Sequence, residues 1–216
     1  MERVEPPRVR TTESYFYNNQ ELKLLYQKIE GNILELAVKL AGSLGMRREE
    51  ICGLKWENVD LQRHLVLIRE ARTAYGATIV QKETKNRSSV RTLYLPDEVY
   101  LLLEQEQARQ QQERCLQSPT YNPTDHVILD AKGVPYSPNA LSLAFTRFVK
   151  KNDLPRLTFH GLRHTFATIA SCQGASLFDI GKALGHSTPA TTGRIYTHLV
   201  DRTHEELVQR VSDALK

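Results

Sequence analysis

The side chains with the clearest chemical potential lie in the segment HGLRHTFAT. His160 and Arg163 are three residues apart, so on a helix both project from one face and can meet a single phosphate. His160 and His164 are four residues apart, which is also the spacing of a zinc-binding pair. The glutamate of an HExxH motif is missing, however, and the sequence offers no evident third ligand. The segment therefore disfavours a zinc site, and His164 is expected to have a packing or supporting role.

A second group of charges lies in GMRREE, which contains Arg47, Arg48, Glu49 and Glu50. Taken alone, this pattern is typical of a solvated helix start with arginine–glutamate pairs. A guanidinium can also bind a phosphate through two parallel charge-assisted hydrogen bonds, and it does not deprotonate at working pH. Both interpretations of Arg47 are open on this segment alone.

Two further features need a wider context. The polar segment KETKNRSS contains Lys82, Lys85 and Arg87, which the sequence barely separates. Tyr196 follows His186 by ten residues, and a single tyrosine is most often a half-buried surface residue.

Four segments stand in one order along the chain: GMRREEICGLKW, ETKNRSSVRTLYLP, HGLRHTFAT, and LGHS followed by TTGRIYTHL. Each is a weak signal alone. Together, at compatible spacings, they resemble the catalytic domain of the tyrosine recombinase, or phage integrase, family, in particular the integrases of phages and conjugative transposons. The resemblance covers nearly everything from about residue 15 to residue 200.

The resemblance implies a role for each candidate. Arg47 and Arg163 are expected to clamp the phosphate, and His160 to act as general base. Lys85 is expected to be the general acid, because it stands six residues before Arg91 in a frame similar to the family's hairpin.

The resemblance also implies roles for His186, Tyr196 and Glu50. His186 is similar to a position that holds histidine or tryptophan in the family, and Tyr196 is the expected nucleophile. The interval between them is one residue longer than is common, and we expect Gly193 to absorb it as a kink or bulge. Glu50 resembles the carboxylate that supports the active-site helix. The other expected site residues, assigned to DNA binding, are Lys82 and Arg87.

The implied reaction is attack of tyrosine on a DNA phosphodiester, which gives a 3′-phosphotyrosine linkage and a 5′-hydroxyl. Cations must neutralise the non-bridging oxygens as charge develops. Tyrosine, with a pKa near 10, needs a base, and the departing 5′-oxygen needs an acid. The linkage retains the energy of the phosphate bond, so no cofactor, ATP or metal ion is expected. The sequence has neither a GxxxxGK[ST] loop nor an acidic metal-binding cluster.

The elements that position these residues are expected to be mostly helical. Helices are predicted over residues 19–31, 33–44 and 48–54, and again from residue 97. Three β-type runs cover 64–68, 77–81 and 90–95, with KETKNRSS as the hairpin tip between the last two. The polarity of EQEQARQQQER is interpreted as a solvated helix face. The expected fold is a mostly helical α+β domain with a small three-stranded antiparallel sheet.

Three regions are expected along the chain. Residues 1–14, with Pro6 and Pro7, read as the remnant of an interdomain linker, and residues 15–200 as the catalytic domain. Residues 201–216 form an amphipathic C-terminal helix that either packs on its own domain or docks on a neighbouring protomer. The family also implies an N-terminal domain that closes around DNA, so we expect an excised fragment, monomeric when free and tetrameric in a synaptic complex.

Composition sets the broad class. The chain has 216 residues, a formal net charge of +4 and three scattered cysteines. The cysteines argue against a disulfide framework, and no apolar run is long enough to span a membrane. The mild positive charge suits a polyanionic partner. We expect a soluble cytoplasmic protein whose partners are double-stranded DNA attachment sites.

Three functions compete on the sequence. The leading hypothesis is a site-specific recombinase that integrates or excises a mobile element. A DNA-binding regulator that has lost catalysis would not need Tyr196 near His186. A type IB topoisomerase would share the chemistry, but the small size and the LGHS segment favour the recombinase.

Overall fold

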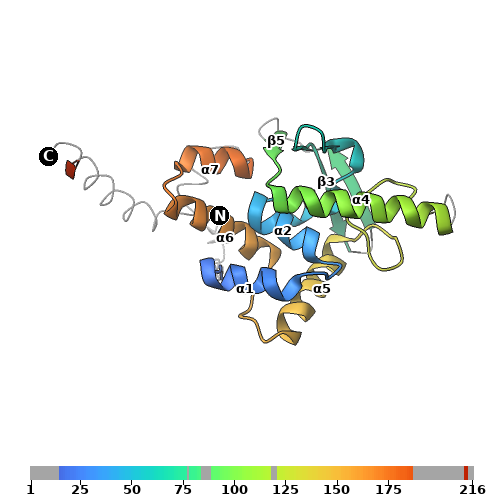
Figure 1. Cartoon of the computed structure of the whole chain (residues 1–216), viewed down its shortest axis with the longest axis horizontal. Coiled ribbons are helices and arrows are strands. Elements are labelled where there is room, and N and C mark those ends of the chain that lie inside the picture. The colour runs from blue at the N-terminus through green and yellow to red at the C-terminus, as the bar shows by residue number, and fades with distance from the viewer. Residues whose placement is uncertain (1–14, 77, 84–88, 118–120, 187–211, 214–216) are drawn as a thin grey trace, which may run out of the picture.

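A computed structural model of the chain describes residues 15–76, 78–83, 89–117, 121–186 and 212–213 (Figure 1). The helices are α1 (Asn19–Ile29), α2 (Glu35–Leu44), α3 (Arg48–Gly53), α4 (Asp97–Gln117), α5 (Pro138–Lys151), α6 (Phe159–Cys172) and α7 (Leu177–Leu184), with a 3-10 helix η1 (Trp56–Asn58). The strands are β1 (Val59–Asp60), β2 (Leu65–Ile68), β3 (Glu70–Tyr75), β4 (Thr78–Glu83) and β5 (Arg91–Tyr94). None of the helices within these residues is long and apolar enough to cross a bilayer.

Helix α2 lies at the centre of the described part of the chain (Figure 1). Most of its residues are buried, as its nearly continuous apolar sequence predicts. It packs against α1, α3, α4 and α6. The helix ends at Gly45, whose φ of +66° is a left-handed conformation that glycine adopts without strain. This turn redirects the chain, so that Arg47, the N-cap of α3, lies right beside the core.

Helix α7 packs on α6 through a small apolar cluster. Ile180 and Leu184 are buried against Ala167 of α6, with Phe166 beside them. Gly185 ends α7 in the left-handed region at φ +64°. The C-terminal end of α7 is therefore seated next to the helix that carries HGLRH.

The β-structure is only partly the one expected. A three-stranded antiparallel sheet has the order β1-β2-β5. The run 77–81 does not join it. Instead, β4 pairs with β3 in a separate antiparallel hairpin, in which Tyr75 faces Thr78 across a turn that contains Gly76 at φ +60°. The prediction that KETKNRSS is a hairpin tip was wrong, because this segment connects two different sheets.

Strand β3 was missed because its sequence, EARTAY, lacks the apolar alternation of a half-buried strand. Its position depends instead on close packing against α3. A Cβ at Gly53 would lie 2.9 Å from the backbone nitrogen of Arg72, so the strand can cross the helix only where a side chain is absent.

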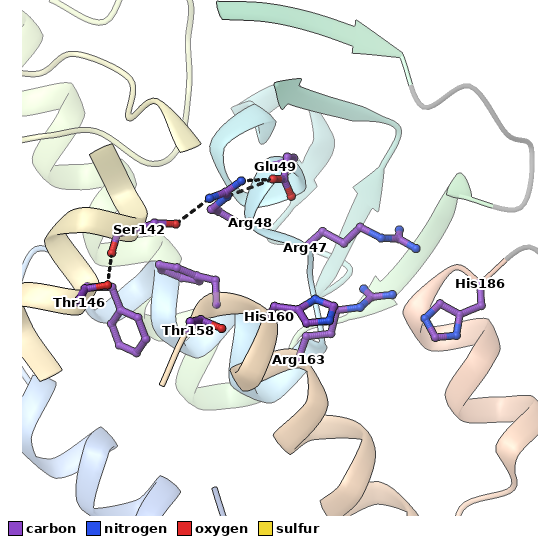
Figure 2. Close-up of a pocket in the computed structure, with 11 residues that line it drawn as sticks. Arg47, Arg48, Glu49, Ser142, Thr146, Thr158, His160, Arg163 and His186 are labelled. Atoms are coloured by element: carbon purple, nitrogen blue, oxygen red, sulfur yellow. Dashed lines mark hydrogen bonds and ion pairs between the residues drawn. The ribbon is translucent and has the colours of Figure 1, made fainter. Parts of the chain in front are cut away.

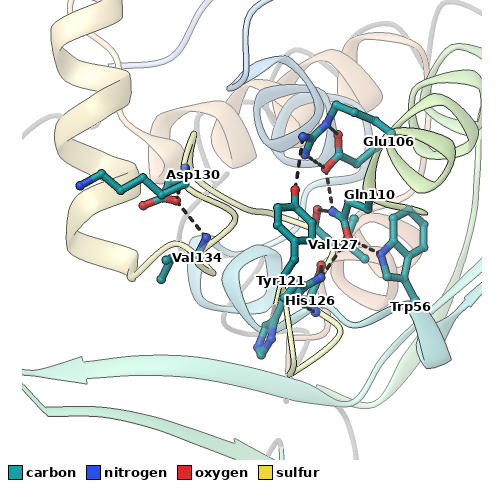
Figure 3. A network of polar contacts seen from close by, with 11 residues as sticks. Trp56, Glu106, Gln110, Tyr121, His126, Val127, Asp130 and Val134 are labelled. Atoms are coloured by element: carbon teal, nitrogen blue, oxygen red, sulfur yellow. Dashed lines mark hydrogen bonds and ion pairs between the residues drawn. The ribbon is translucent and has the colours of Figure 1, made fainter. Parts of the chain in front are cut away.

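The Glu/Gln-rich part of α4 is not only a solvated face. Gln110 is 2% exposed, and its Oε1 accepts hydrogen bonds from Trp56 Nε1 and Asn122 Nδ2, both at 2.9 Å. Its Nε2 donates to the Val127 carbonyl at 2.9 Å and to Glu106 at 2.6 Å. Figure 3 shows this network, which joins α4 to η1 and to the loop before α5.

The network continues to the β-hairpin through His126, whose Nε2 lies 2.8 Å from Gln81 Oε1. Burial, followed by the charges of Arg72 and Lys55, lowers the pKa of His126 to about 4. The ring is therefore neutral at physiological pH, and its hydrogen bond to Gln81 connects the loop before α5 to β4.

The structures expected at the two ends of the chain remain predictions. The linker expected at residues 1–14 lies outside the described residues. Of the C-terminal helix expected at 201–216, only Ser212 and Asp213 are described, and they are helical.

Candidate active site

A pocket of about 520 Å³ collects four of the predicted site residues from segments far apart in the sequence. Arg47 comes from the start of α3, His160 and Arg163 from α6, and His186 from the residues after α7. Figure 2 shows that the guanidinium groups of Arg47 and Arg163 point toward His186. Arg48 and Glu49, which pair with each other, also line the pocket, so Arg47, Arg163 and the two histidines are left as a donor set that suits an anion.

Arg47 precedes α3 and is oriented by the buried carboxylate of Glu50. Its backbone N–H donates to Glu50 Oε2 at 2.8 Å, and its Nη1 donates to Glu50 Oε1 at 2.7 Å. The side chain then extends to the Gly185 carbonyl, which accepts from Nη2 at 3.0 Å. The solvated helix start is therefore not the arrangement observed, because Glu50 is only 2% exposed.

Arg163 is buried, in contrast to Arg47. Its Nη1 donates to the Gly45 carbonyl and its Nη2 to the Leu184 carbonyl, each at 2.6 Å. These two bonds tie the turn after α2 to the end of α7 and fix the plane of the guanidinium.

The C-terminal carbonyls of α7 accept from three arginines in succession. Such carbonyls have no partner within their helix, and the C-terminal end of a helix carries a negative partial charge. The three pairs are Arg91 Nε to Ala183 O at 2.7 Å, Arg163 Nη2 to Leu184 O at 2.6 Å, and Arg47 Nη2 to Gly185 O at 3.0 Å. The helix end thereby offsets part of the repulsion among three like charges.

Glu50 supplies the full negative charge at this place. Arg91 binds both of its oxygens, with Nη1 to Oε1 at 3.0 Å and Nη2 to Oε2 at 2.9 Å. Burial alone raises the pKa of the Glu50 carboxyl, but the hydrogen bonds and charges of Arg91 and Arg47 outweigh it, so the pKa lies below its ordinary value. The carboxylate stays ionised and keeps both arginines in place.

His160 lines the pocket from the first turn of α6. Burial of its ring, followed by the positive charge of Arg163, lowers its pKa. The imidazole is therefore neutral at neutral pH and able to accept a proton. Its Nε2 lies 2.8 Å from Nε2 of His164, which is buried one turn further along the helix. Within the described residues, no group of three or more metal-binding side chains accompanies this pair.

His186 follows the left-handed turn at Gly185, and its backbone N–H donates to the Gly181 carbonyl at 3.0 Å. Burial lowers its pKa to about 4, with further lowering from the nearby positive charges of Arg163, Arg47 and Arg91. The neutral ring can donate one hydrogen bond to an anion in the pocket.

Helix α5 forms the opposite wall of the pocket through Ser142 and Thr146. Arg48 Nη1 donates to Ser142 Oγ at 2.8 Å, and Arg48 also pairs with Glu49. Nothing in the sequence pattern indicated that α5 would reach this site.

Arg91 was not predicted as a site residue, and it served only to align Lys85 with the family's hairpin. A signal was present, since Leu93 and Leu95 alternate with exposed residues and Arg91 occupies the same inward phase of the strand. A charge at an inward position of a strand indicates a buried partner.

The other predicted residues are not in the described pocket. Lys82 lies on β4 as an exposed residue, with its Nζ 5.6 Å from the centre of the Tyr75 ring. Outside the described residues lie Lys85, Arg87, Gly193 and Tyr196.

Residues 16–203 match the sequence profile of the phage integrase family. A XerC-like tyrosine recombinase of Caldanaerobacter subterraneus subsp. tengcongensis is 26% identical over 216 residues, covering 94% of this chain and 55% of that protein. The ICEBs1 integrase of Bacillus subtilis is 25% identical over 171 residues, covering 79% of this chain and 46% of that protein. The chain spans about half the length of these curated relatives.

Solved structures resemble the chain in fold. The Tn1549 transposon integrase in complex with transposon right end DNA has a TM-score of 0.80 at 21% identity, over 95% of this chain and 69% of that chain. The XerA recombinase has a TM-score of 0.68 at 24% identity, over 95% of this chain and 66% of that chain.

Proposed function

The chain belongs to the phage integrase family and has the mostly helical α+β fold of its catalytic domains, and from this premise we propose that it is the catalytic domain of a site-specific DNA recombinase. In this proposal it cleaves and rejoins DNA strands to integrate or excise a mobile element. We further propose residues 15–200 as the catalytic domain, residues 1–14 as an interdomain linker and residues 201–216 as a C-terminal helix.

One observation carries the proposal: the convergence of Arg47, Arg163, His160 and His186 on one pocket. Two arginines provide permanent positive charge for the non-bridging oxygens of a phosphodiester. Two neutral histidines provide a proton acceptor and a hydrogen-bond donor. The arginines stabilise the negative charge of a phosphoryl transfer transition state. His160 stays neutral beside them and can still accept the proton of the nucleophile.

In the proposed reaction, Tyr196 and Lys85 take the roles that the family resemblance implies. The phenolic oxygen of Tyr196 attacks the phosphorus, and its proton passes to His160. The bond from phosphorus to the 5′-oxygen breaks, and Lys85 protonates the leaving oxygen. The product is a 3′-phosphotyrosine linkage, which the 5′-hydroxyl of another strand attacks in the reverse sense. Arg47, Arg163 and His186 bind the phosphate throughout.

We propose double-stranded attachment sites as the partner, with Lys82 and Arg87 contacting the DNA backbone and four protomers in the synaptic complex. The net charge of +4 and the DNA bound to the Tn1549 integrase support this partner class. Because a single domain neutralises few phosphates, we expect weak binding that added salt weakens further.

The test is covalent capture. The full chain is incubated with a nicked suicide duplex that carries a candidate attachment site, and the products are separated on a denaturing gel. Wild type and Tyr94→Phe, which changes an exposed tyrosine of β5, should both give a protein–DNA band, whereas Tyr196→Phe should give none. Equal bands from Tyr196→Phe and wild type would refute the assignment of the nucleophile. DNA binding without any band, in this chain and in a longer form of the protein, would favour a regulator without catalysis.

A further inference from the structure

Arg91 occupies a junction between three elements. It begins β5, yet its side chain is only 6% exposed and reaches α3 and α7. It binds both oxygens of Glu50 on α3, and its Nε donates to the Ala183 carbonyl on α7 at 2.7 Å. Gly185 makes room for it, because a Cβ there would lie 2.9 Å from Arg91 Nη1.

These contacts close a ring. Glu50 accepts two hydrogen bonds from Arg91 and two from Arg47, which is about the number that one carboxylate can accept. Arg47 continues to the Gly185 carbonyl, two residues after the Ala183 carbonyl that Arg91 binds. The ring therefore connects Arg47 to the backbone immediately before His186 by two routes.

Arg91 itself stands apart from the reacting atoms. The described residues that line the pocket include Arg47 and His186 but not Arg91 or Glu50. Arg91 binds the carboxylate through two parallel hydrogen bonds, a geometry that fixes the orientation of both side chains. Its contribution to protein stability is expected to be small, since a buried ion pair adds little net stability compared with an apolar replacement.

We propose that Arg91 is a positioning residue, which aligns Arg47 with His186 on one phosphate by binding Glu50 and the end of α7 together. This inference rests on the recombinase function proposed above. Arg91 acts on the transition state through Arg47, so its removal slows the chemical step more than it weakens DNA binding.

The variant that tests this is Arg91→Lys, which keeps the charge and loses the fork. Arg109→Lys is the matched control, because Arg109 makes a similar two-point pair with Glu106 on α4, at 2.7 and 2.8 Å. For each folded variant, DNA affinity and the single-turnover rate of covalent complex formation at saturating suicide duplex are measured separately. We expect Arg91→Lys to slow the rate by ~100-fold with affinity changed by less than ~3-fold, and Arg109→Lys to change neither.

A double mutant separates positioning from general destabilisation. If Arg91 acts through Arg47, then Arg91→Lys should add less than ~3-fold to the rate loss of Arg47→Ala. Losses that multiply, or an unchanged rate in folded Arg91→Lys, would overturn the proposal. Should Arg91→Lys fail to fold, Glu50→Gln breaks the same ring with little change in volume and is expected to give the same pattern.

A second readout needs no DNA cleavage. Inorganic phosphate is titrated into wild type and Arg91→Lys while the Nε–Hε signals of Arg47 and Arg163 are followed by NMR. We expect saturable shifts of both signals in wild type and weaker binding, with the Arg47 shift most reduced, in the variant. If wild type binds phosphate but forms no covalent complex, the proposed function fails while the positioning role is still tested. Identical phosphate titrations in the two proteins would contradict the positioning role.

Discussion

The Nε2 atoms of His160 and His164 lie 2.8 Å apart, and the two rings stand at 84° to one another. A hydrogen bond between two ring nitrogens needs one donor and one acceptor, so only one of these nitrogens carries a proton. His164 is buried, whereas His160 lines the pocket. The buried ring therefore biases the tautomer of the ring that lines the pocket, as partners of functional histidines commonly do.

Replacing His164 should affect catalysis although it does not line the pocket. His164→Phe keeps a buried ring but removes the partner of His160 Nε2, and we expect covalent complex formation to slow by ~10-fold. His164→Gln, which can still hydrogen-bond, should recover part of the loss. The rates are compared with thermal unfolding of each variant. An unchanged rate in well-folded His164→Phe would show that the ring pair has no role in proton transfer.

The rate of covalent complex formation should fall at acidic pH. Burial and the charge of Arg163 place the pKa of His160 below its ordinary value of 6.5. A general base works only when neutral, so the rate should be flat near neutral pH and decline only below about pH 6.5, as His160 becomes protonated. A pH–rate profile at saturating DNA checks this, with DNA affinity measured at each pH. A decline that begins well above pH 6.5 would contradict the assignment.

Protein stability should also decline in acid. His126 and His186 titrate at about 4 in the folded protein, against an ordinary value of 6.5. Between these pH values the unfolded chain binds more protons than the folded one, so the free energy of unfolding decreases as pH falls from 6.5 to 4. His126→Gln should flatten this dependence without touching the pocket. Urea unfolding measured at several pH values tests it, and an unaltered slope in the variant would exclude His126 as a source.

The turn after α2 should be sensitive to a single methyl group. Gly45 has φ +66°, and a Cβ there would lie 2.7 Å from carbons of Leu184 and Phe166. Gly31 has φ +71°, but no described atom lies within 4 Å of its Cβ position. Gly31→Ala should therefore cost only the backbone strain, ~1 kcal/mol, whereas Gly45→Ala adds overpacking of ~1–3 kcal/mol. Equal losses in urea unfolding would show that the contact with α7 relaxes freely.

Local sequence information was sufficient for the parts of the protein that depend on near neighbours. The helices begin and end close to the expected residues, because capping groups such as Asn18 and left-handed glycines such as Gly45 act within a few residues. His160 and Arg163 share a helix face, as their spacing predicts. The order of the motifs also indicated the family, which the match over residues 16–203 confirms.

Only the tertiary structure decided which distant segments meet. The run 77–81 has the same local pattern whether it pairs with β3 or with β5, and the choice depends on the packing of β3 across Gly53. The inward phase of Arg91 indicates a buried partner but not which one, and its partners Glu50 and Ala183 are 41 and 92 residues away. Such pairs depend on which buried carboxylates and helix ends the fold brings together. Periodicity along the chain does not identify a partner that is distant in sequence.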